Sequence, residues 1–264
     1  MIMPSDAIET RLDGSVATVL LNRPDDGNAL TRAMLAELRQ ALGDLHQQKR
    51  IRAIILTGAG EAFSVGRDPA EMNAAGEDPR GDLARWGDEA NEYRDLLVSM
   101  LEMPKPILAA VNGPALAGGA GLVLGCDAVV AAEGAEFGFP EPRRGSVAGV
   151  AAPLLAHRVG AGSAARLLVT AATIDAAEAH RLAIFHEIVA ADLLWARAFE
   201  LGKHCSEAAP QAIQLTKRLL YETIGEQLAT QLSSGAIASA TSRTTESAAE
   251  GLKAIEEGRP PEWP

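Results

Sequence analysis

The sequence predicts an α/β domain of stacked strand–helix units, followed by a helical C-terminal subdomain. Strand-like and helix-like segments alternate as far as about residue 190, which is the pattern of βα units. Two strand-like runs, IRAIILTG and KPILAAVNG, are continuously apolar and end in glycine, as parallel strands buried on both faces do. From Asp192 onward the periodicity is helical almost to the last residue. We therefore predict a core over residues 1–195 and a helical subdomain over residues 196–264.

The composition allows a large core and argues against nucleic acid as a partner. Of the 264 residues, 47% are hydrophobic and 22% are charged, but only 4% are aromatic. The core must therefore consist mainly of Ala, Val, Leu and Ile. The formal net charge of −11 disfavours non-specific binding of nucleic acid, which needs a basic face. An anionic small ligand is still compatible, because a few local cations or backbone N–H groups suffice to bind it.

The sequence shows no signal for export or for a membrane. Its N-terminus lacks a basic stretch followed by an apolar run. No apolar stretch reaches the length of about 18 residues that a membrane span needs. Cys126 and Cys205 lie far apart in apolar or helical surroundings, which predicts two reduced thiols. We expect a soluble, cytoplasmic protein.

The first elements are a hairpin and a capped helix. The segment AIETRLDGSVATVLLNRP alternates apolar and polar residues on both sides of Asp13-Gly14, which predicts a β-hairpin. Thr31 is the predicted N-cap of a helix whose apolar residues recur at helical spacing, namely Met34, Leu35, Leu38 and Leu42. Residues 70–85 are polar and contain Gly and Pro, so we expect a mobile surface segment there.

Two later turns, FSVGRD and ALAGGAG, could carry chemistry. Each follows an apolar strand, so each should place backbone N–H groups at a helix N-terminus, where they lack an intrahelical partner. If both turns meet at one edge of the sheet, two N–H groups can converge on one carbonyl oxygen and stabilise an enolate or tetrahedral oxyanion. The alternative is that these glycines serve only as helix caps and packing sites.

Other kinds of site find less support in the sequence. GAGEAF lacks the third glycine of a dinucleotide-binding turn. The five histidines show no metal-ligand spacing, and no Ser/His/Asp constellation is marked, so we expect no metal. Asp68 is predicted to cap a helix, and Asp127 to be structural.

Five segments occur in an order and spacing that is more specific than any one of them: LNRPDDGNAL, LTGAGEAFSVGRD, KPILAAVNGPALAGGAGLVLGCD, AEFGFPEPRRG and EGLKAIEEGRPPEW. Through them the chain resembles the crotonase (enoyl-CoA hydratase/isomerase) superfamily over nearly its full length. The resemblance implies a crotonase-like spiral of ββα units, a homotrimer or a dimer of trimers, and an acyl-CoA thioester as ligand. It implies no cofactor, since CoA is part of the substrate. The helical subdomain would then serve oligomerisation, with amphipathic helices such as QAIQLTKRLL burying apolar stripes against a neighbour.

The resemblance also implies roles for particular residues. Arg67 and Gly118 would each supply one N–H of an oxyanion hole. The backbone of four residues, together with Arg67, would line the CoA moiety: Asp26, Gly27, Ala29 and Val65. The family usually has a small residue where this chain has Arg67. Its side chain could pair with a CoA phosphate, pair with an acidic acyl group, or point to solvent.

One catalytic carboxylate is absent and one is present. Hydratases of the family carry a carboxylate in the helix after the glycines, where this chain has Gly121. The second family carboxylate corresponds to Glu141, in FGFPEP. A single glutamate suits a proton shuttle, whereas hydration also asks for a group that orients water. The space above Gly121 could instead admit a bound anion.

The resemblance therefore predicts an acyl-CoA enzyme in which Glu141 is the acid/base, acting by hydration or by double-bond isomerisation of an enoyl-CoA. The alternative is a catalytically inactive crotonase-like protein that binds CoA or acts in assembly. Taken without the resemblance, Glu141 could be a solvated loop carboxylate between two prolines. Arg143 and Arg144, which follow it closely, could lower its pKa or face solvent.

Overall fold

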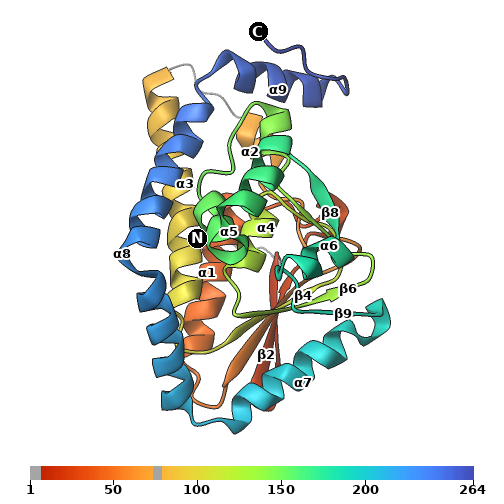
Figure 1. Ribbon diagram of the computed structural model, residues 1–264, viewed down its shortest axis with the longest axis vertical. Coiled ribbons are helices and arrows are strands. Elements are labelled where there is room, and N and C mark those ends of the chain that lie inside the picture. The colour runs from red at the N-terminus through yellow and green to blue at the C-terminus, as the bar shows by residue number, and fades with distance from the viewer. Residues whose placement is uncertain (1–6, 74–78) are drawn as a thin grey trace.

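The computed structural model describes residues 7–73 and 79–264, which are organised around a six-stranded sheet (Figure 1). In spatial order the strands are β1 (Ile8–Asp13), β2 (Val16–Leu21), β3 (Ala53–Gly58), β4 (Ile107–Val111), β6 (Ala128–Ala132) and β9 (Glu187–Val189). β1 is antiparallel to β2, and every later neighbouring pair is parallel. The predicted α/β class is therefore confirmed.

The N-terminal hairpin forms as predicted, with its turn one residue further along. Asp13 pairs with Val16, so the two turn residues are Gly14 and Ser15. Gly14 has a φ of 60°, a conformation that glycine adopts without a steric penalty at the first position of a tight hairpin turn.

The central parallel strands β3 and β4 are buried on both faces, which explains why they read as continuous apolar runs. Ile54 and Leu56 of β3 enter the main hydrophobic core, whereas Ile55 enters a second, smaller core on the opposite face. The second core is closed by α7 (Leu194–Glu207), which crosses the sheet in Figure 1. The predicted boundary near residue 195 falls at the start of this helix, and the division into two domains stays a prediction.

The predicted cap and helix after the hairpin are confirmed, but the predicted mobile segment is largely helical. Thr31 accepts a hydrogen bond from Met34 N (3.1 Å) and caps α1 (Arg32–Gln47). Most of the described part of residues 70–85 is helical and forms α2 (Pro69–Asn73) and the start of α3 (Pro79–Glu102), and the mobility of this segment stays a prediction. Residues 74–78 of that segment lie outside the described residues. The polar composition concealed α3, because its charged side chains pair within the protein.

A second, three-stranded sheet leads into the helices beside the site. Its strands are β5 (Ala115–Leu116), β7 (Glu136–Gly138) and β8 (Thr173–Asp175), in that order. The helix α4 (Gly118–Leu124) follows β5, and the short 3-10 helix η2 (Glu141–Arg144) follows β7. The other elements before the C-terminal region are η1 (Pro24–Asp26), α5 (Ala151–Thr170), α6 (Ala176–Arg181) and η3 (Ala191–Leu193).

The C-terminal helices complete the surroundings of the site. The long α8 (Pro210–Ser242) runs beside α3 along its length (Figure 1). The last helix, α9 (Glu246–Glu256), packs directly on η2, and a Cβ built on Gly251 would lie 2.2 Å from the carbonyl oxygen of Arg144. Only glycine permits that approach. Among the described residues, no helix has the length and apolar character that crossing a membrane requires.

Candidate active site

The two glycine turns lie side by side at one edge of the sheet. Both follow parallel strands, β3 and β4, whose carboxyl ends share that edge. A backbone bridge joins Ser64 to Ala115, and Leu116 N donates to the carbonyl oxygen of Ser64 (2.9 Å). The topology therefore brings together the two segments that the sequence singled out.

The N–H groups of Arg67 and Gly118 belong to these touching turns. A Cβ built on Gly118 would lie 3.8 Å from Arg67 N. Gly118 is the first residue of α4, so its N–H has no carbonyl one turn earlier to bind. Leu30 N donates to Gly66 O, and Asp68 N donates to Leu30 O. Arg67 lies between these two bonded residues, so its N–H points away from Leu30 and takes no part in either bond. Arg67 itself precedes α2 by two residues, so only Gly118 opens a helix as expected.

The turn before α4 holds a strained backbone. Ala117 has φ 51° and ψ −121°, a region in which a Cβ is sterically disfavoured. Such conformations persist only where the surroundings enforce them, and they are concentrated at functional sites. A Cβ on the neighbouring Gly66 would lie 2.5 Å from the Ala117 side chain, so the two turns interlock.

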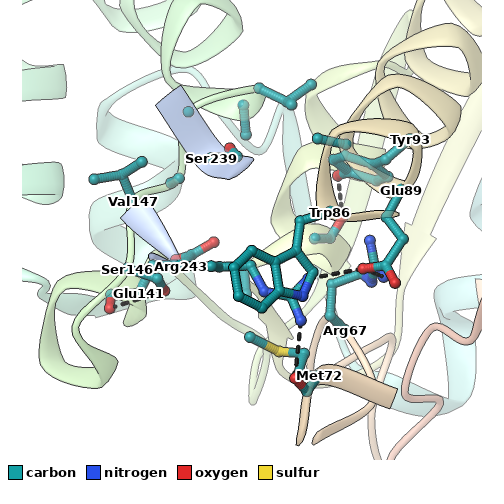
Figure 2. A pocket seen from close by; sticks show the side chains of 17 residues that line it. Arg67, Met72, Trp86, Glu89, Tyr93, Glu141, Ser146, Val147, Ser239 and Arg243 are labelled. Atoms are coloured by element: carbon teal, nitrogen blue, oxygen red, sulfur yellow. Dashed lines mark hydrogen bonds and ion pairs between the residues drawn. The ribbon is translucent and has the colours of Figure 1, made fainter. Parts of the chain in front are cut away.

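Glu141 reaches the same cavity from the opposite side. The cavity has a volume of about 110 Å³ and is lined by both Gly118 and Glu141 (Figure 2). The carboxylate atom Oε2 is buried and has no hydrogen-bond partner among the described residues. Burial raises the pKa of Glu141 to about 7, and the charge of Arg144 opposes this rise. A carboxyl group in this state can both accept and return a proton near neutral pH.

The space beside Gly121 is filled by the phenol of Tyr93, from α3. A Cβ built on Gly121 would lie 2.1 Å from Tyr93 Oη and 3.2 Å from Tyr93 Cζ. Tyr93 is buried, and its hydroxyl donates a hydrogen bond to Gly118 O (2.5 Å). Burial raises the pKa of Tyr93, so the phenol stays protonated. An anion above Gly121, one of the alternatives expected from the sequence, finds no room there.

The side chain of Arg67 turns inward, which rules out one of the three alternatives considered for it, an orientation toward solvent. Its Nη2 donates to Oε2 of Glu89 (3.0 Å), and the Glu89 side chain is only 4% exposed. The same carboxylate oxygen accepts from Arg243 Nη1 (2.7 Å). Arg243 also donates to the carbonyl oxygen of Met72 (2.8 Å), and its guanidinium stacks on Trp86 at 4.8 Å from the ring centroid.

Four cavity residues were missed by sequence reasoning: Trp86, Glu89, Tyr93 and Arg243. Three of them lie on α3, and the spacing from Trp86 to Glu89 and Tyr93, three and then four residues, places them on one helical face. That spacing was available in the sequence. Local spacing could not identify Arg243 as a cavity residue, because its partner Glu89 is 154 residues away in the sequence.

The four other residues expected at CoA form a neighbouring cluster outside this cavity. Val65 N donates to Gly27 O (3.0 Å), and Gly27, with φ 60°, packs closely against the Val65 side chain. Asp26 pairs with Arg23 at the surface, and Ala29 is buried. Their connection to the cavity runs through Arg67, two residues after Val65, so their role toward CoA stays a prediction.

The expectations that Asp68 caps a helix and that Asp127 is structural agree with the structure. Asp68 accepts from Ala70 N (2.9 Å) at the start of α2 and pairs with Arg23. Asp127 accepts from Ile107 N (2.8 Å) and from Lys217, which ties α8 to the sheet. Cys126 and Cys205 are both free thiols. In the part of the chain that the structure describes, no three His, Cys, Asp or Glu side chains are grouped as metal ligands.

Comparison with known sequences gives one consistent result. A family model described as enoyl-CoA hydratase/isomerase matches residues 11–264. A putative enoyl-CoA hydratase of Thermus thermophilus is 38% identical over 255 residues, which cover 95% of this chain and 98% of that protein. A short-chain-enoyl-CoA hydratase of Clostridium acetobutylicum is 34% identical over 210 residues, which cover 79% of this chain and 78% of that protein.

Solved structures show the same fold. An enoyl-CoA hydratase/isomerase from Xanthobacter autotrophicus superposes with a TM-score of 0.88 at 29% identity, covering 95% of this chain and 93% of that chain. A monofunctional enoyl CoA isomerase from M. smegmatis superposes with a TM-score of 0.71 at 27% identity, covering 86% of this chain and 98% of that chain. The residues matched by the family model, 11–264, include both glycine turns, Glu141 and the C-terminal helices.

Proposed function

The chain belongs to the enoyl-CoA hydratase/isomerase family, and on that premise we propose that it moves a double bond in an enoyl-CoA by shuttling one proton through Glu141. The observation that carries the proposal is the position of Glu141. Its carboxyl group, with a pKa of about 7, lies in the cavity that Gly118 lines from the other side, and its Oε2 has no hydrogen-bond partner among the described residues.

The thioester oxygen would bind between the N–H groups of Arg67 and Gly118. Support comes from the contact between their turns and from the position of Gly118 in the first turn of α4, where its N–H has no intrahelical acceptor. When a base removes a proton beside the thioester carbonyl, negative charge develops on this oxygen. Donors that are already aimed at the oxygen stabilise the charge without reorganisation, and one such donor is typically worth about 10²–10³ in rate.

Glu141 would act first as base and then as acid. Its carboxylate takes a proton from Cα of a 3-enoyl-CoA, and the electron pair of the broken C–H bond delocalises into the thioester as a dienolate. The protonated Glu141 then delivers the same proton to Cγ, which leaves the double bond between Cα and Cβ. No proton or electron is gained or lost overall. A pKa near 7 suits both half-reactions, because neither form of the carboxyl group is strongly disfavoured.

Isomerisation is preferred to hydration because of Tyr93. Hydration needs a second group that orients and deprotonates water, and the place for it beside Gly121 is taken by the phenol. The Tyr93 proton is already donated to Gly118 O, and the raised pKa of the phenol makes it a weak base for water. Hydration by Glu141 alone is the second candidate, supported by the names of the two sequence relatives described above.

The deciding experiment replaces Glu141 by glutamine. Glu141→Gln keeps the size of the side chain and removes its capacity to accept a proton. We expect the exchange of the acyl-CoA α-proton with deuterium, and the conversion of 3-enoyl-CoA to 2-enoyl-CoA, to fall at least 10³-fold, with the Kd for the thioester changed only a few-fold. Glu136→Gln, on the exposed side of β7, is the matched control and should exchange at the wild-type rate.

Each other result has a definite meaning. If Glu141→Gln retains full exchange, the base has been misassigned. If the wild type binds CoA thioesters but neither exchanges, isomerises nor hydrates any of a broad panel, the chain is the inactive binding or assembly protein considered from its sequence. If 3-hydroxyacyl-CoA accumulates faster than the isomer, hydration is the reaction.

A further inference from the structure

The arginine end of the cavity carries an unbalanced positive charge. Arg67 and Arg243 bind the same oxygen of one carboxylate, that of Glu89, at 3.0 Å and 2.7 Å. The side chains of the two arginines are only 19% and 11% exposed. Two cations therefore share one anion in a nearly dry environment, where an uncompensated charge is costly. No ion pair joins Glu141 to either arginine in the described part of the chain, so it does not restore the balance.

Arg85 does not change this charge count. It lies beside the cluster, with its Nε 3.9 Å from Glu89 Oε1, but its Nη2 pairs with Asp82 at 3.1 Å. Arg85, one turn before Glu89 on α3, thus adds a third guanidinium beside Glu89, and Asp82, two turns before Glu89, offsets the charge of Arg85. Neither of them lines the cavity.

Hydrogen-bond donors are also left over at the same end of the cavity. The Nε atoms of Arg67 and Arg243 and the indole Nε1 of Trp86 are buried without a hydrogen-bond partner among the described residues. All three side chains line the cavity (Figure 2). Buried donors in folded proteins are nearly always paired, and an orphan indicates a missing ligand, water or ion. Arg85 Nε and Nη2 are also buried without a hydrogen-bond partner in the described part of the chain, but Arg85 does not line the cavity, whereas the other three donors do.

The rest of the cavity wall offers few polar partners to a charged group of a ligand. Toward η2 and α5 the wall is mostly apolar, with Ala148, Val150 and Ala151 beside the hydroxyl group of Ser146. Ser239 adds a second hydroxyl group, but the cationic donors of the described lining are only Arg67 and Arg243.

On the basis of the proposed function, we infer that the acyl group of the substrate is short and ends in a carboxylate that binds to Arg67, Arg243 and Trp86. The substrate class would be ω-carboxyacyl-CoA thioesters. A carboxylate supplies the missing negative charge, and its oxygens can accept from several N–H groups at once. The cavity volume of about 110 Å³ limits the acyl group to a few carbon atoms beyond the thioester.

The test compares pairs of thioesters that differ only at the acyl end. Glutaryl-CoA is paired with 5-methylhexanoyl-CoA, in which an isopropyl group replaces the carboxylate. Adipoyl-CoA is paired in the same way with 6-methylheptanoyl-CoA. We measure Kd by calorimetry and the rate of α-proton exchange with deuterium. We expect at least one carboxylate compound to bind ten-fold or more tighter than its neutral partner. Equal or tighter binding of both neutral compounds would overturn the inference.

Arginine variants locate the effect. Arg243→Met removes one cation, and the preference for the carboxylate should fall at least ten-fold, while Arg243→Lys should keep part of it. Arg181→Met, at a strongly exposed position on α6, is the control and should keep all of it. If Arg243→Met folds and the preference is unchanged, the carboxylate does not bind here. If it does not fold, the wild-type comparison and Arg243→Lys still decide.

Failure of this inference can be distinguished from failure of the proposed function. If neutral thioesters exchange their α-protons as fast as carboxylated ones, the proposed enolate chemistry stands and the carboxylate site is wrong. If carboxylated thioesters bind selectively but nothing exchanges, the carboxylate site stands and the chemistry is wrong. If no thioester binds at millimolar concentration, both are wrong.

Discussion

The hydroxyl oxygen of Tyr93 lies 2.1 Å from the position that a Cβ would take on Gly121. The glycine is therefore not an empty place for a second carboxylate, because the protein has filled that place with a phenol from another helix. The ring approaches to 3.2 Å at Cζ, so a side chain at Gly121 would meet the hydroxyl first and the ring second. Several consequences can be measured.

Gly121→Ala should destabilise the protein despite the better helix propensity of alanine. Overpacking a rigid core position typically costs about 1–3 kcal/mol, which exceeds the gain of roughly 1 kcal/mol from replacing a helical glycine. Urea unfolding measures the difference. In a Tyr93→Phe background the closest contact is gone, so the loss should shrink. An additive double-mutant cycle would contradict the contact. Gly121→Glu, designed to restore a hydratase-like carboxylate, should fold only together with Tyr93→Ala.

Tyr93→Phe should impair catalysis more than binding. It removes the hydrogen bond to Gly118 O, at a cost of about 0.5–1.5 kcal/mol in stability. The first turn of α4 then loses a constraint on the N–H of Gly118. We expect kcat to fall at least five-fold with KM nearly unchanged. A rise in KM alone would assign Tyr93 to substrate binding instead of to positioning the turn.

Activity should rise with pH around neutrality. The proposed base is active as a carboxylate, and burial raises the pKa of Glu141 to about 7. We expect kcat/KM to increase about ten-fold per pH unit below 7 and to level off above it, since the deprotonated fraction then saturates. The measurement is a kcat/KM profile from pH 5 to 9 in buffers of constant ionic strength. A plateau that extends down to pH 5 would show that Glu141 is not the titrating group.

Ionisation of Glu141 should also lower the stability of the folded protein as the pH rises, whereas it raises the activity. The raised folded pKa means that the folded protein holds a proton that the unfolded chain has lost between pH 4.5 and about 7. The contribution of Glu141 to wild-type stability therefore decreases across this window and then stays constant. Glu141→Gln should be more stable than wild type at pH 8, by up to about 3 kcal/mol, and equally stable at pH 4. Glu136→Gln should show no such difference.

A row of apolar side chains on α8 should be covered by another copy of the chain. Leu215, Leu219 and Leu220 are 57%, 64% and 62% exposed, which is unusual for leucines grouped within two helical turns. We expect a trimer at micromolar concentration, and we expect Leu219→Glu with Leu220→Glu to weaken it. Leu12→Glu, on the edge strand β1, is the control. Sedimentation of the wild type as a monomer alone would refute the prediction.

Several elements could be predicted because their signals are local. The apolar runs of β3 and β4 indicated buried parallel strands, and Thr31 identified its helix start through a hydrogen bond that spans only three residues. The two glycine turns were also recognisable, because each depends on a few consecutive residues. The polar stretch before Trp86 was misread, since nothing local shows that its charged side chains pair inside the protein.

The sequence by itself determined the α/β class, the family, the two turns and the position of Glu141 as the remaining carboxylate. Only the tertiary structure decided what fills the space beside Gly121 and where Arg67 points. Tyr93 is 28 residues from Gly121 in the sequence, and Arg243 is 154 residues from Glu89. Helical and strand periodicity depends on neighbours within a few residues, whereas steric filling and charge pairing depend on which distant segments the chain topology brings together. The character of the cavity is therefore set by contacts between α3, the Arg67 turn and the end of α8.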